Sequence, residues 1–259
     1  MKHGDFTGLG EVYDSTRPDY SEAVIDIAPG LIGKNINQIE VADVGAGTGI
    51  WTRMLAQRQF DKVYAVEPNG DMRNVGEGKS NLLNFKHIKW IDGRAEKTNL
   101  SSESLDWVTM ASSFHWADFD QATLEFHRIL RKRGYLTALW NPRVIEDSPI
   151  LLDIEAEIEN IKPNIKRVSS GKSQFTDNLT NKLATSPFFE DVVYLESKHN
   201  IIMPTERYLG IWRSVNDLRV QLGEANFEIF LKYVNEKTKN IKVIEATYLT
   251  RAWFARRKD

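Results

Sequence analysis

The stretch QIEVADVGAGTGIWTRMLAQR, residues 38–58, decides the fold of this chain. It begins with a short apolar run rich in β-branched side chains, which is typical of a buried strand. In its second half, Ile50, Met54 and Leu55 share one face of a helix. Between the two lies Gly-Ala-Gly-Thr-Gly, residues 45–49. A strand, a glycine turn and a helix in this order predict the first half of a βαβ unit.

The same alternation of apolar runs and helical stripes continues to about residue 141. The further predicted strands are 62–66, 85–91, 105–110 and 135–140. One predicted helix starts at Asn69, a suitable N-cap, and another covers residues 117–133, with basic residues in its last turn and a stop at Gly134. Only a crossover helix returns the chain to the same edge of a sheet, so these strands are expected to be parallel. Residues 38–141 therefore predict a doubly wound α/β core.

After Trp140 the alternation stops, and helices mix with strands. The predicted helices are 148–161, 177–185, 205–222 and 224–237, the predicted strands are 191–197 and 244–256, and residues 169–177 are expected to be a loop. The extra helices are expected to form a lid on the same core, because no linker separates them from it. The expected organisation is an N-terminal cap segment (1–36), a cofactor-binding core (37–145), a helical lid for the substrate (146–176 and 203–243) and C-terminal strands that complete the sheet (177–202 and 244–259).

Composition and charge exclude several classes of function. The 259 residues carry 34 Lys and Arg against 36 Asp and Glu, a formal charge of −2, whereas a nucleic-acid groove or an anionic membrane surface needs a strong positive excess. The absence of Cys excludes disulfides, thiolate nucleophiles, and zinc–thiolate or iron–sulfur sites. The start of the chain is polar and no run of 18 apolar residues occurs, so we expect a cytoplasmic protein without a signal peptide, membrane partner or nucleic-acid partner. The oligomeric state is left open.

The glycine turn indicates a ligand held close to the backbone, where any Cβ would collide with it. Its third glycine comes one position too early for the dinucleotide fingerprint, and no G-x-x-x-x-G-K-[ST] phosphate loop is present. Asp43, at the end of the first strand, would repel a pyrophosphate and attract an ammonium group. Glu67 ends the second strand 22 residues after Gly45, where a carboxylate can accept both hydroxyls of a ribose. In the alternative interpretation, Asp43 only caps the turn and Glu67 only caps a helix.

Residues 10–141 resemble the class I S-adenosylmethionine-dependent methyltransferases. The matching motifs are D-V-G-A-G-T-G at residues 43–49, A-V-E-P at 65–68, G-R-A-E at 93–96, and R-I-L-R-K-R-G-Y-L at 128–136, where the family has K-P-G-G in place of K-R-G. The resemblance implies S-adenosylmethionine as the cofactor and an α/β fold, a doubly wound, mostly parallel, seven-stranded Rossmann-like sheet with an added helical lid. The cofactor-binding residues that it implies are Tyr13, Arg17, Asp43, Gly45, Ala46, Gly47, Gly49, Glu67, Pro68, Met72, Ala95, Glu96, Ala111 and Ser112.

Three shorter motifs narrow the resemblance within that family. They are Y-D-S-T-R-P-D-Y at residues 13–20, S-F-H-W at 113–116 and W-N-P-R at 140–143. They are similar to motifs of small-molecule methyltransferases of the trans-aconitate and farnesoic acid type, within the type 11 group. The resemblance fades after residue 145, in the region expected to choose the substrate.

His115 is the candidate catalytic residue, because an imidazole with a pKa of about 6.5 suits a general base near neutral pH. A base is required only for a hydroxyl or ammonium acceptor, since a carboxylate attacks as it stands. In the alternative interpretation, His115 only packs against its loop. The candidate substrate-binding residues are Tyr20, His115, Trp116, Trp140, Asn141, Arg143, Tyr208, Trp212 and Arg213. Each has a plain core or surface role as its alternative, and no cluster of His, Asp and Glu has the spacing of a metal site.

The sequence thus predicts an enzyme that methylates a small metabolite with S-adenosylmethionine. O-methylation of an acidic or hydroxylated substrate is favoured, because several arginines flank the predicted pocket. One alternative is an enzyme that uses another electrophilic carbon of the same sulfonium, by aminocarboxypropyl transfer or by cyclisation. Another is a non-catalytic module that senses the cofactor. A nicotinamide-dependent oxidoreductase is disfavoured by Asp43 and by the early third glycine.

Overall fold

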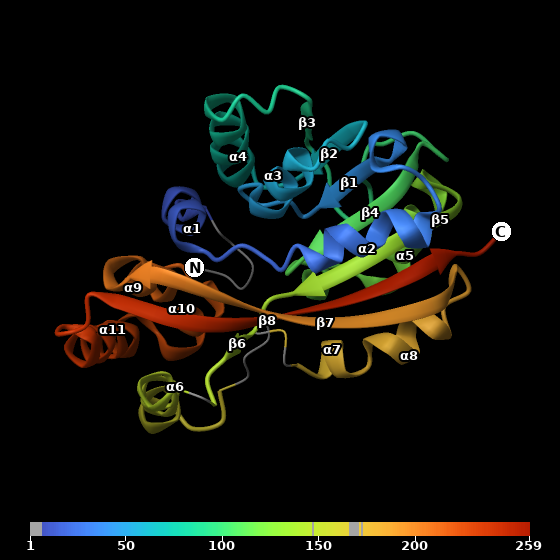
Figure 1. The fold of residues 1–259 in the computed structure, drawn as a ribbon. Helices are drawn as coiled ribbons and strands as arrows, with labels where there is room; N and C mark the ends of the chain where they lie inside the picture. Colours follow the sequence, from blue (N-terminus) through green and yellow to red (C-terminus); the bar gives the residue numbers. More distant parts are fainter. Residues whose placement is uncertain (1–6, 147, 166–170, 172) are drawn as a thin grey trace.

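The computed structural model describes residues 7–146, 148–165, 171 and 173–259 (Figure 1). Its centre is one sheet in the order β3-β2-β1-β4-β5-β8, with β7 paired to the far side of β8. The strands are β1 (Glu40–Val44), β2 (Lys62–Val66), β3 (Ile88–Ile91), β4 (Leu105–Ala111), β5 (Leu130–Trp140), the two-residue β6 (Arg143–Val144), β7 (Phe189–Pro204) and β8 (Val243–Arg257).

Strands β1 to β5 pair in parallel, whereas β8 runs antiparallel to both β5 and β7. The short β6 also pairs with β8 and continues the line of β5. Asp43 lies opposite Ala65 in β2 and Thr109 in β4, so the carboxyl ends of these strands meet at one edge. The predicted seven-stranded, mostly parallel Rossmann-like sheet is confirmed.

Helices cover both faces of the sheet, so the central strands β1 and β4 are buried on both sides. The helices are α1 (Gly10–Thr16), α2 (Ala23–Ile32), α3 (Ile50–Gln57), α4 (Gly70–Leu82), α5 (Phe119–Ile129), α6 (Pro149–Ile161), α7 (Gln174–Asp177), α8 (Leu179–Ala184), α9 (Thr205–Arg213), α10 (Asn216–Leu222) and α11 (Glu224–Thr238), with short 3-10 turns at Ile36–Gln38 and Phe114–Trp116. One hydrophobic core joins α2 and α3 to the sheet around Trp51 and Trp107. The core on the other face joins α5 and α8 to it around Phe126 and Leu183.

Helices α6, α9, α10 and α11, which we term the lid, form a separate group with a hydrophobic core of its own. Helices α9, α10 and α11 make up the connection between β7 and β8, and α6 packs against α11. Figure 1 shows this group at one end of the long β7–β8 pair, next to α1. Its core includes Ile154 of α6, Trp212 of α9, Phe230 of α11 and Tyr248 of β8. The group is therefore attached to the sheet through β7 and β8 and lies beside the carboxyl ends of the parallel strands.

The helix predicted over residues 117–133 is shorter than expected. It ends at Ile129, and Leu130 is already extended, with φ −71° and ψ 141°. Arg131 is drawn into β5, where its guanidinium pairs with Asp106 and Glu40 on neighbouring strands. The basic residues 131–133 and Gly134 predicted that the helix ends at residue 133. The ion pairs of Arg131 instead hold these residues in β5, so the predicted stop at Gly134 is wrong.

Other boundaries also differ from the predictions. The third strand starts at Ile88 rather than at residue 85, and the strand predicted over 191–197 extends over β7. The helix predicted over 205–222 is broken at Ser214 and Val215, whose backbones close the last turn of α9. Of the predicted loop 169–177, residues 169, 170 and 172 lie outside the described residues, and Gln174–Asp177 forms the short helix α7.

Candidate active site

The glycine turn after β1 folds tightly because its glycines adopt conformations that other residues avoid. Gly45, Gly47 and Gly49 have φ of +70°, +57° and +81°. A Cβ at Gly45 would lie 2.7 Å from Oγ of Ser113, and one at Gly49 would lie 2.8 Å from the ring of Trp90. Gly45 therefore allows the loop after β4 to approach the turn.

Glu67 connects the end of β2 to this turn. Its Oε2 accepts the backbone N–H of Gly47 at 2.8 Å, and its Oε1 accepts that of Asn69 at 2.9 Å. Burial raises the pKa of Glu67, while these two N–H groups counteract the shift. A carboxylate has about four lone-pair sites, so both oxygens can accept further hydrogen bonds from a ligand.

Asp43 is fully buried beneath the turn. Its Oδ2 accepts the hydroxyl of Thr52 at 2.6 Å, whereas its Oδ1 has no hydrogen-bond partner among the described residues. Burial raises the pKa of Asp43 to about 7, an effect that the hydroxyl of Thr52 opposes and the negative charge of Glu67 reinforces. A buried carboxylate oxygen without a partner is suited to a cationic group of a ligand.

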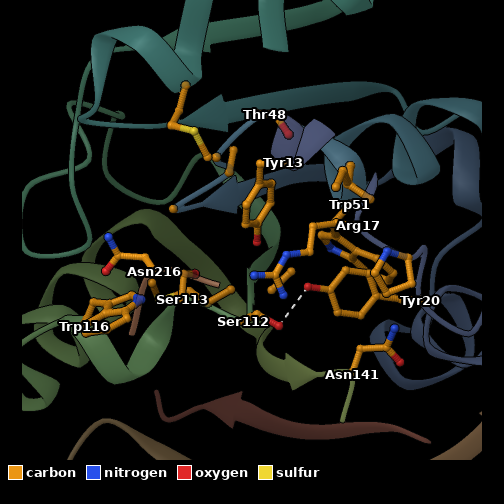
Figure 2. Close-up of a pocket in the computed structure, with 18 of the residues that line it drawn as sticks. Tyr13, Arg17, Tyr20, Thr48, Trp51, Ser112, Ser113, Trp116, Asn141 and Asn216 are labelled. Carbon is orange, nitrogen blue, oxygen red and sulfur yellow. Dashed lines mark hydrogen bonds between the residues drawn. The ribbon is translucent and has the colours of Figure 1, made fainter. Parts of the chain in front are cut away.

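A cavity of about 860 Å³ opens at the carboxyl ends of β1, β2, β4 and β5. Figure 2 shows Tyr13, Arg17 and Tyr20 on one side of it and Trp116 and Asn216 on the other, with Ser112 and Ser113 between them. The lining thus comes from the strand ends, the N-terminal segment and the lid helices. A cavity of this size, lined by aromatic side chains and a few charged groups, is typical of a small-molecule site.

The N-terminal wall is held in place by side-chain hydrogen bonds. Tyr20 donates its hydroxyl to Oγ of Ser112 at 2.9 Å (dashed line in Figure 2). Arg17 lies over the ring of Tyr13 at 4.8 Å and donates to both Oγ and the carbonyl oxygen of Ser214, at 2.9 and 3.0 Å. Ser112 has φ +52°, which is unusual for a residue with a side chain. The tyrosine hydroxyl helps to hold the strained residue at the floor of the cavity.

Arg143 supplies a buried positive charge on the lid side. Its guanidinium lies 4.8 to 5.9 Å from the ring centres of Trp212, Tyr208 and Tyr248 and donates to the hydroxyl of Tyr208 at 3.2 Å. Glu155 is 3.8 Å away, and Nε of Arg143 has no hydrogen-bond partner among the described residues. Burial would lower the pKa of Arg143, but Tyr208, Tyr248 and Glu155 together raise it. The side chain therefore stays cationic inside the cavity wall.

His115 does not line this cavity. Its Nδ1 accepts the indole N–H of Trp140 at 3.2 Å, and its ring packs 4.4 Å from the ring of Trp116. Burial lowers the pKa of His115 to about 4, although the charge of Asp217 opposes this shift. His115 is therefore neutral near pH 7. It packs against Trp116, which lines the cavity, without lining the cavity itself.

Most of the predicted site residues come together around the cavity. Those that line it are Tyr13, Arg17, Tyr20, Gly45, Ala46, Gly47, Glu67, Pro68, Met72, Ala95, Glu96, Ala111, Ser112, Trp116, Asn141, Arg143 and Trp212. Six others do not line it: Asp43, Gly49, His115, Trp140, Tyr208 and Arg213. Of these, Asp43 and Gly49 belong to the turn, Trp140 and Tyr208 are buried behind the wall, and Arg213 is exposed.

The sequence did not single out several lining residues of the lid. Glu155 on α6, Asn216 and Asp217 at the start of α10, and Tyr248 on β8 all face the cavity. Asn216 and Asp217 are nearly fully buried. The preference of Asn and Asp for helix starts could have located the break before α10, but no signal in the sequence placed it near the cavity.

Two further features of the described residues bear on the class of site. No group of three or more His, Cys, Asp and Glu side chains in the described parts of the chain could hold a metal ion. No described helix combines the length and the apolar character needed to cross a bilayer.

Comparisons with known proteins agree with this geometry. Residues 42–138 match the model of the family described as "Methyltransferase domain". An uncharacterized methyltransferase of Mycobacterium tuberculosis is 34% identical over 132 residues, which cover 51% of this chain and 49% of the relative. An uncharacterized methyltransferase of Schizosaccharomyces pombe is 23% identical over 93% of this chain and 92% of its own length.

The first curated relatives are matched over about half of their length. Among solved structures, a protein of Anaeromyxobacter dehalogenans superposes with a TM-score of 0.64 at 18% identity, over 93% of this chain and 97% of that one. At this identity the superposition supports the fold alone.

Proposed function

We propose that this chain, whose residues 42–138 match a methyltransferase domain, acts as a class I S-adenosylmethionine-dependent methyltransferase and transfers a methyl group to a carboxylate oxygen of a small acidic metabolite. S-adenosylmethionine supplies a methyl carbon that is already strongly electrophilic on its sulfonium. The protein therefore has to orient the two ligands, hold the acceptor oxygen in line with that carbon and exclude water.

The residues around the glycine turn fit this cofactor. Gly47 leaves its backbone open to the cavity, and a Cβ there would come within 3.6 Å of Met72. We propose that Glu67 accepts the ribose hydroxyls and that Asp43, which is buried beneath the turn and does not line the cavity, attracts the ammonium group through its negative charge. Ala95 and Glu96, which line the same cavity, are proposed to contact the adenine.

The observation that carries the proposal for the acceptor is the buried cation of Arg143. Its guanidinium is held by three aromatic rings, and its nearest described carboxylate, that of Glu155, lies 3.8 Å away. An anionic group entering the cavity is attracted by the guanidinium of Arg143, which is part of the cavity lining. We infer that one carboxylate of the substrate binds there.

A carboxylate acceptor also agrees with the position of His115. The imidazole is neutral, its Nδ1 is engaged by Trp140, and the ring does not line the cavity. No proton has to be removed from an ionised carboxylate, so the reaction needs no base at this position. The proposed role of His115 is to position Trp116, which closes the cavity.

A panel of mono-, di- and tricarboxylic acids tests this proposal, with S-adenosylmethionine as the donor. We expect S-adenosylhomocysteine to form together with a methyl ester that mild alkali cleaves. Arg143→Gln should raise the KM for the acid about 30- to 150-fold, the equivalent of about 2–3 kcal/mol for a charged hydrogen bond, and leave the affinity for S-adenosylhomocysteine unchanged.

Arg213→Gln is the matched control, because Arg213 is an exposed arginine of the same lid and should be replaceable without effect. A loss of cofactor affinity in Arg143→Gln that equals the change in KM would contradict the assignment of Arg143 to the acceptor.

A second candidate function is methylation of a hydroxyl group. Asp217 supports it, because this carboxylate lines the cavity and its side chain is almost fully buried on α10. It is a candidate for the base that a hydroxyl acceptor requires. A product that resists mild alkali, with turnover abolished by Asp217→Asn, would favour this function over ester formation.

A further inference from the structure

We propose that Arg53 is a positioning residue that couples the cofactor turn to helix α1 and, through α1, to the lid side of the cavity. The inference rests on the proposed function only for the identity of the ligand at the glycine turn. It adds that ligand binding at the glycine turn orders α1 and the start of α10, which line the acceptor side of the cavity.

The guanidinium of Arg53 on α3 contacts both the glycine turn and helix α1. Its Nη1 donates to the carbonyl oxygen of Thr48 in the glycine turn, and its Nη2 pairs with Oδ1 of Asp14 on α1, both at 2.5 Å. The side chains of Asp14 and Arg53 are 8% and 12% exposed. Because the guanidinium is planar and rigid, it fixes these two acceptors relative to each other. Gly49 leaves room for it, since a Cβ there would lie 3.2 Å from Nη1.

Helix α1 depends on such contacts for its position. It has seven residues, and an isolated helix of this length is not stable in water. Its start packs on α4, where a Cβ at Gly10 would lie 2.9 Å from Val75, and its end packs on α9, where a Cβ at Gly210 would lie 2.3 Å from Thr16. Asp14 lies between these two contacts. The helix is therefore held between the cofactor core and the lid.

The residue that follows α1 is hydrogen-bonded to the lid. Arg17 donates two hydrogen bonds to Ser214, and Arg207 of α9 donates to the carbonyl oxygen of Arg17 at 3.0 Å. Ser214 precedes Asn216, which lines the cavity, and Tyr13 and Arg17 line it as well. A continuous series of polar contacts thus runs from the glycine turn through Arg53 and α1 to the lid.

A ligand that orders the glycine turn should therefore also order α1 and the start of α10. Coupling of this kind is reciprocal, so seating of α1 should in turn favour ligand binding. The expected consequence for catalysis is an ordered sequence, in which the cofactor binds before the acceptor.

Hydrogen exchange of the full chain with S-adenosylhomocysteine tests the coupling. At about ten times Kd, opening motions that exclude the ligand should slow about tenfold. In the wild type we expect this protection in residues 10–16, 50–57 and 214–217. In Asp14→Asn, measured at ten times its own calorimetric Kd, we expect protection to persist in 50–57 and to be lost in 10–16 and 214–217.

Two further variants complete the experiment. Glu11→Gln changes an exposed carboxylate of the same helix and should keep the wild-type pattern. Arg53→Lys keeps the charge but loses the rigid fork, so protection of residues 10–16 should fall to an intermediate level, and this variant also serves if Asp14→Asn does not fold.

Three outcomes would overturn the proposal. The first is wild-type protection of residues 10–16 in Asp14→Asn. The second is a wild type that gains protection in 50–57 but none in 10–16. The third is the absence of both protection and calorimetric binding in the wild type, which would overturn the proposed cofactor together with this inference.

Discussion

Asp43 is a residue whose ionisation the fold changes strongly. A carboxyl group with an ordinary pKa near 3.9 is moved to about 7, because it is buried beneath the glycine turn and lies close to the charge of Glu67. Since the folded pKa is the higher one, the unliganded protein holds a proton that the unfolded chain releases. Stability from this group therefore decreases as the pH rises from about 4 to about 7.

This raised pKa predicts how cofactor affinity depends on pH. An ammonium group bound in front of the glycine turn would favour the ionised form of the buried Asp43, so binding below pH 7 should release a proton. Affinity for S-adenosylhomocysteine should fall about tenfold between pH 8 and pH 6, since about a tenth of the carboxyl groups are ionised one unit below the pKa. Calorimetry in buffers of different ionisation enthalpy measures both the affinity and the released proton.

Asp43→Asn should bind more weakly at pH 8 and lose the dependence on pH. The exposed Asp61 offers the control, because Asp61→Asn should behave as the wild type does. An unchanged pH dependence in Asp43→Asn would mean that another group carries it.

At the scale of the elements, the start of β5 is determined by ion pairs rather than by local sequence. Asp106 on β4 has a side chain that is 3% exposed and accepts from Lys34 at 2.6 Å, from Arg131 at 2.9 Å and from the backbone of Glu40 at 3.0 Å. This cluster lies at the amino ends of β1 and β4, opposite the cavity. Because of these ion pairs, residues 130–133 form the start of β5 and not the last turn of the predicted helix.

The cluster predicts a loss of stability without a loss of binding. Asp106→Asn removes a buried charge that accepts hydrogen bonds from two partly exposed cations, and such a change costs about 1–3 kcal/mol in free energy of unfolding. Urea unfolding at pH 7 should show a lower midpoint with an unchanged m-value, while the Kd for S-adenosylhomocysteine stays the same.

Asp153→Asn is the control, because Asp153 and Lys237 form an exposed pair of the same length, 2.6 Å, between α6 and α11. Its unfolding midpoint should match that of the wild type. If both variants lose the same stability, burial is not what makes the cluster at Asp106 strong.

The elements that could be predicted are those with a strong local pattern. Residues 38–58 carry the apolar run, the glycines and the helical stripe in one short stretch, and the structure has β1, the turn and α3 there. The break between α9 and α10 and the full length of β7 could not be read in the same way. They depend on partners far away in the chain, such as Arg17 for Ser214 and β8 for the whole of β7.

At the scale of the whole molecule, the same distinction applies to the site. Gly45, Glu67 and Ser112 could be predicted to converge because they follow parallel strands, whose carboxyl ends must meet at one edge. Glu155 and Asp217 could not, because they reach the cavity only through the packing of the lid. An imidazole near neutral pH predicts a catalytic base at His115. The side chain is instead buried, accepts the indole N–H of Trp140 and does not line the cavity.

The glycine turn lies at the edge of the sheet and the proposed acceptor site lies beside the lid, with α1 in contact with both α4 of the core and α9 of the lid. The lid has its own hydrophobic core, which shares no buried residue with the cores on the two faces of the sheet. This division explains why the sequence identifies the donor more readily than the acceptor.

The fate of S-adenosylmethionine during turnover tests the central claim most directly. Mass spectrometry of reactions with the carboxylic acid panel should detect S-adenosylhomocysteine and a product heavier by one methyl group, in equal amounts. Methylthioadenosine in place of S-adenosylhomocysteine would mean that another carbon of the sulfonium is transferred or cyclised. Binding without any consumption of S-adenosylmethionine would mean that the site senses the cofactor, and either result would contradict methyl transfer.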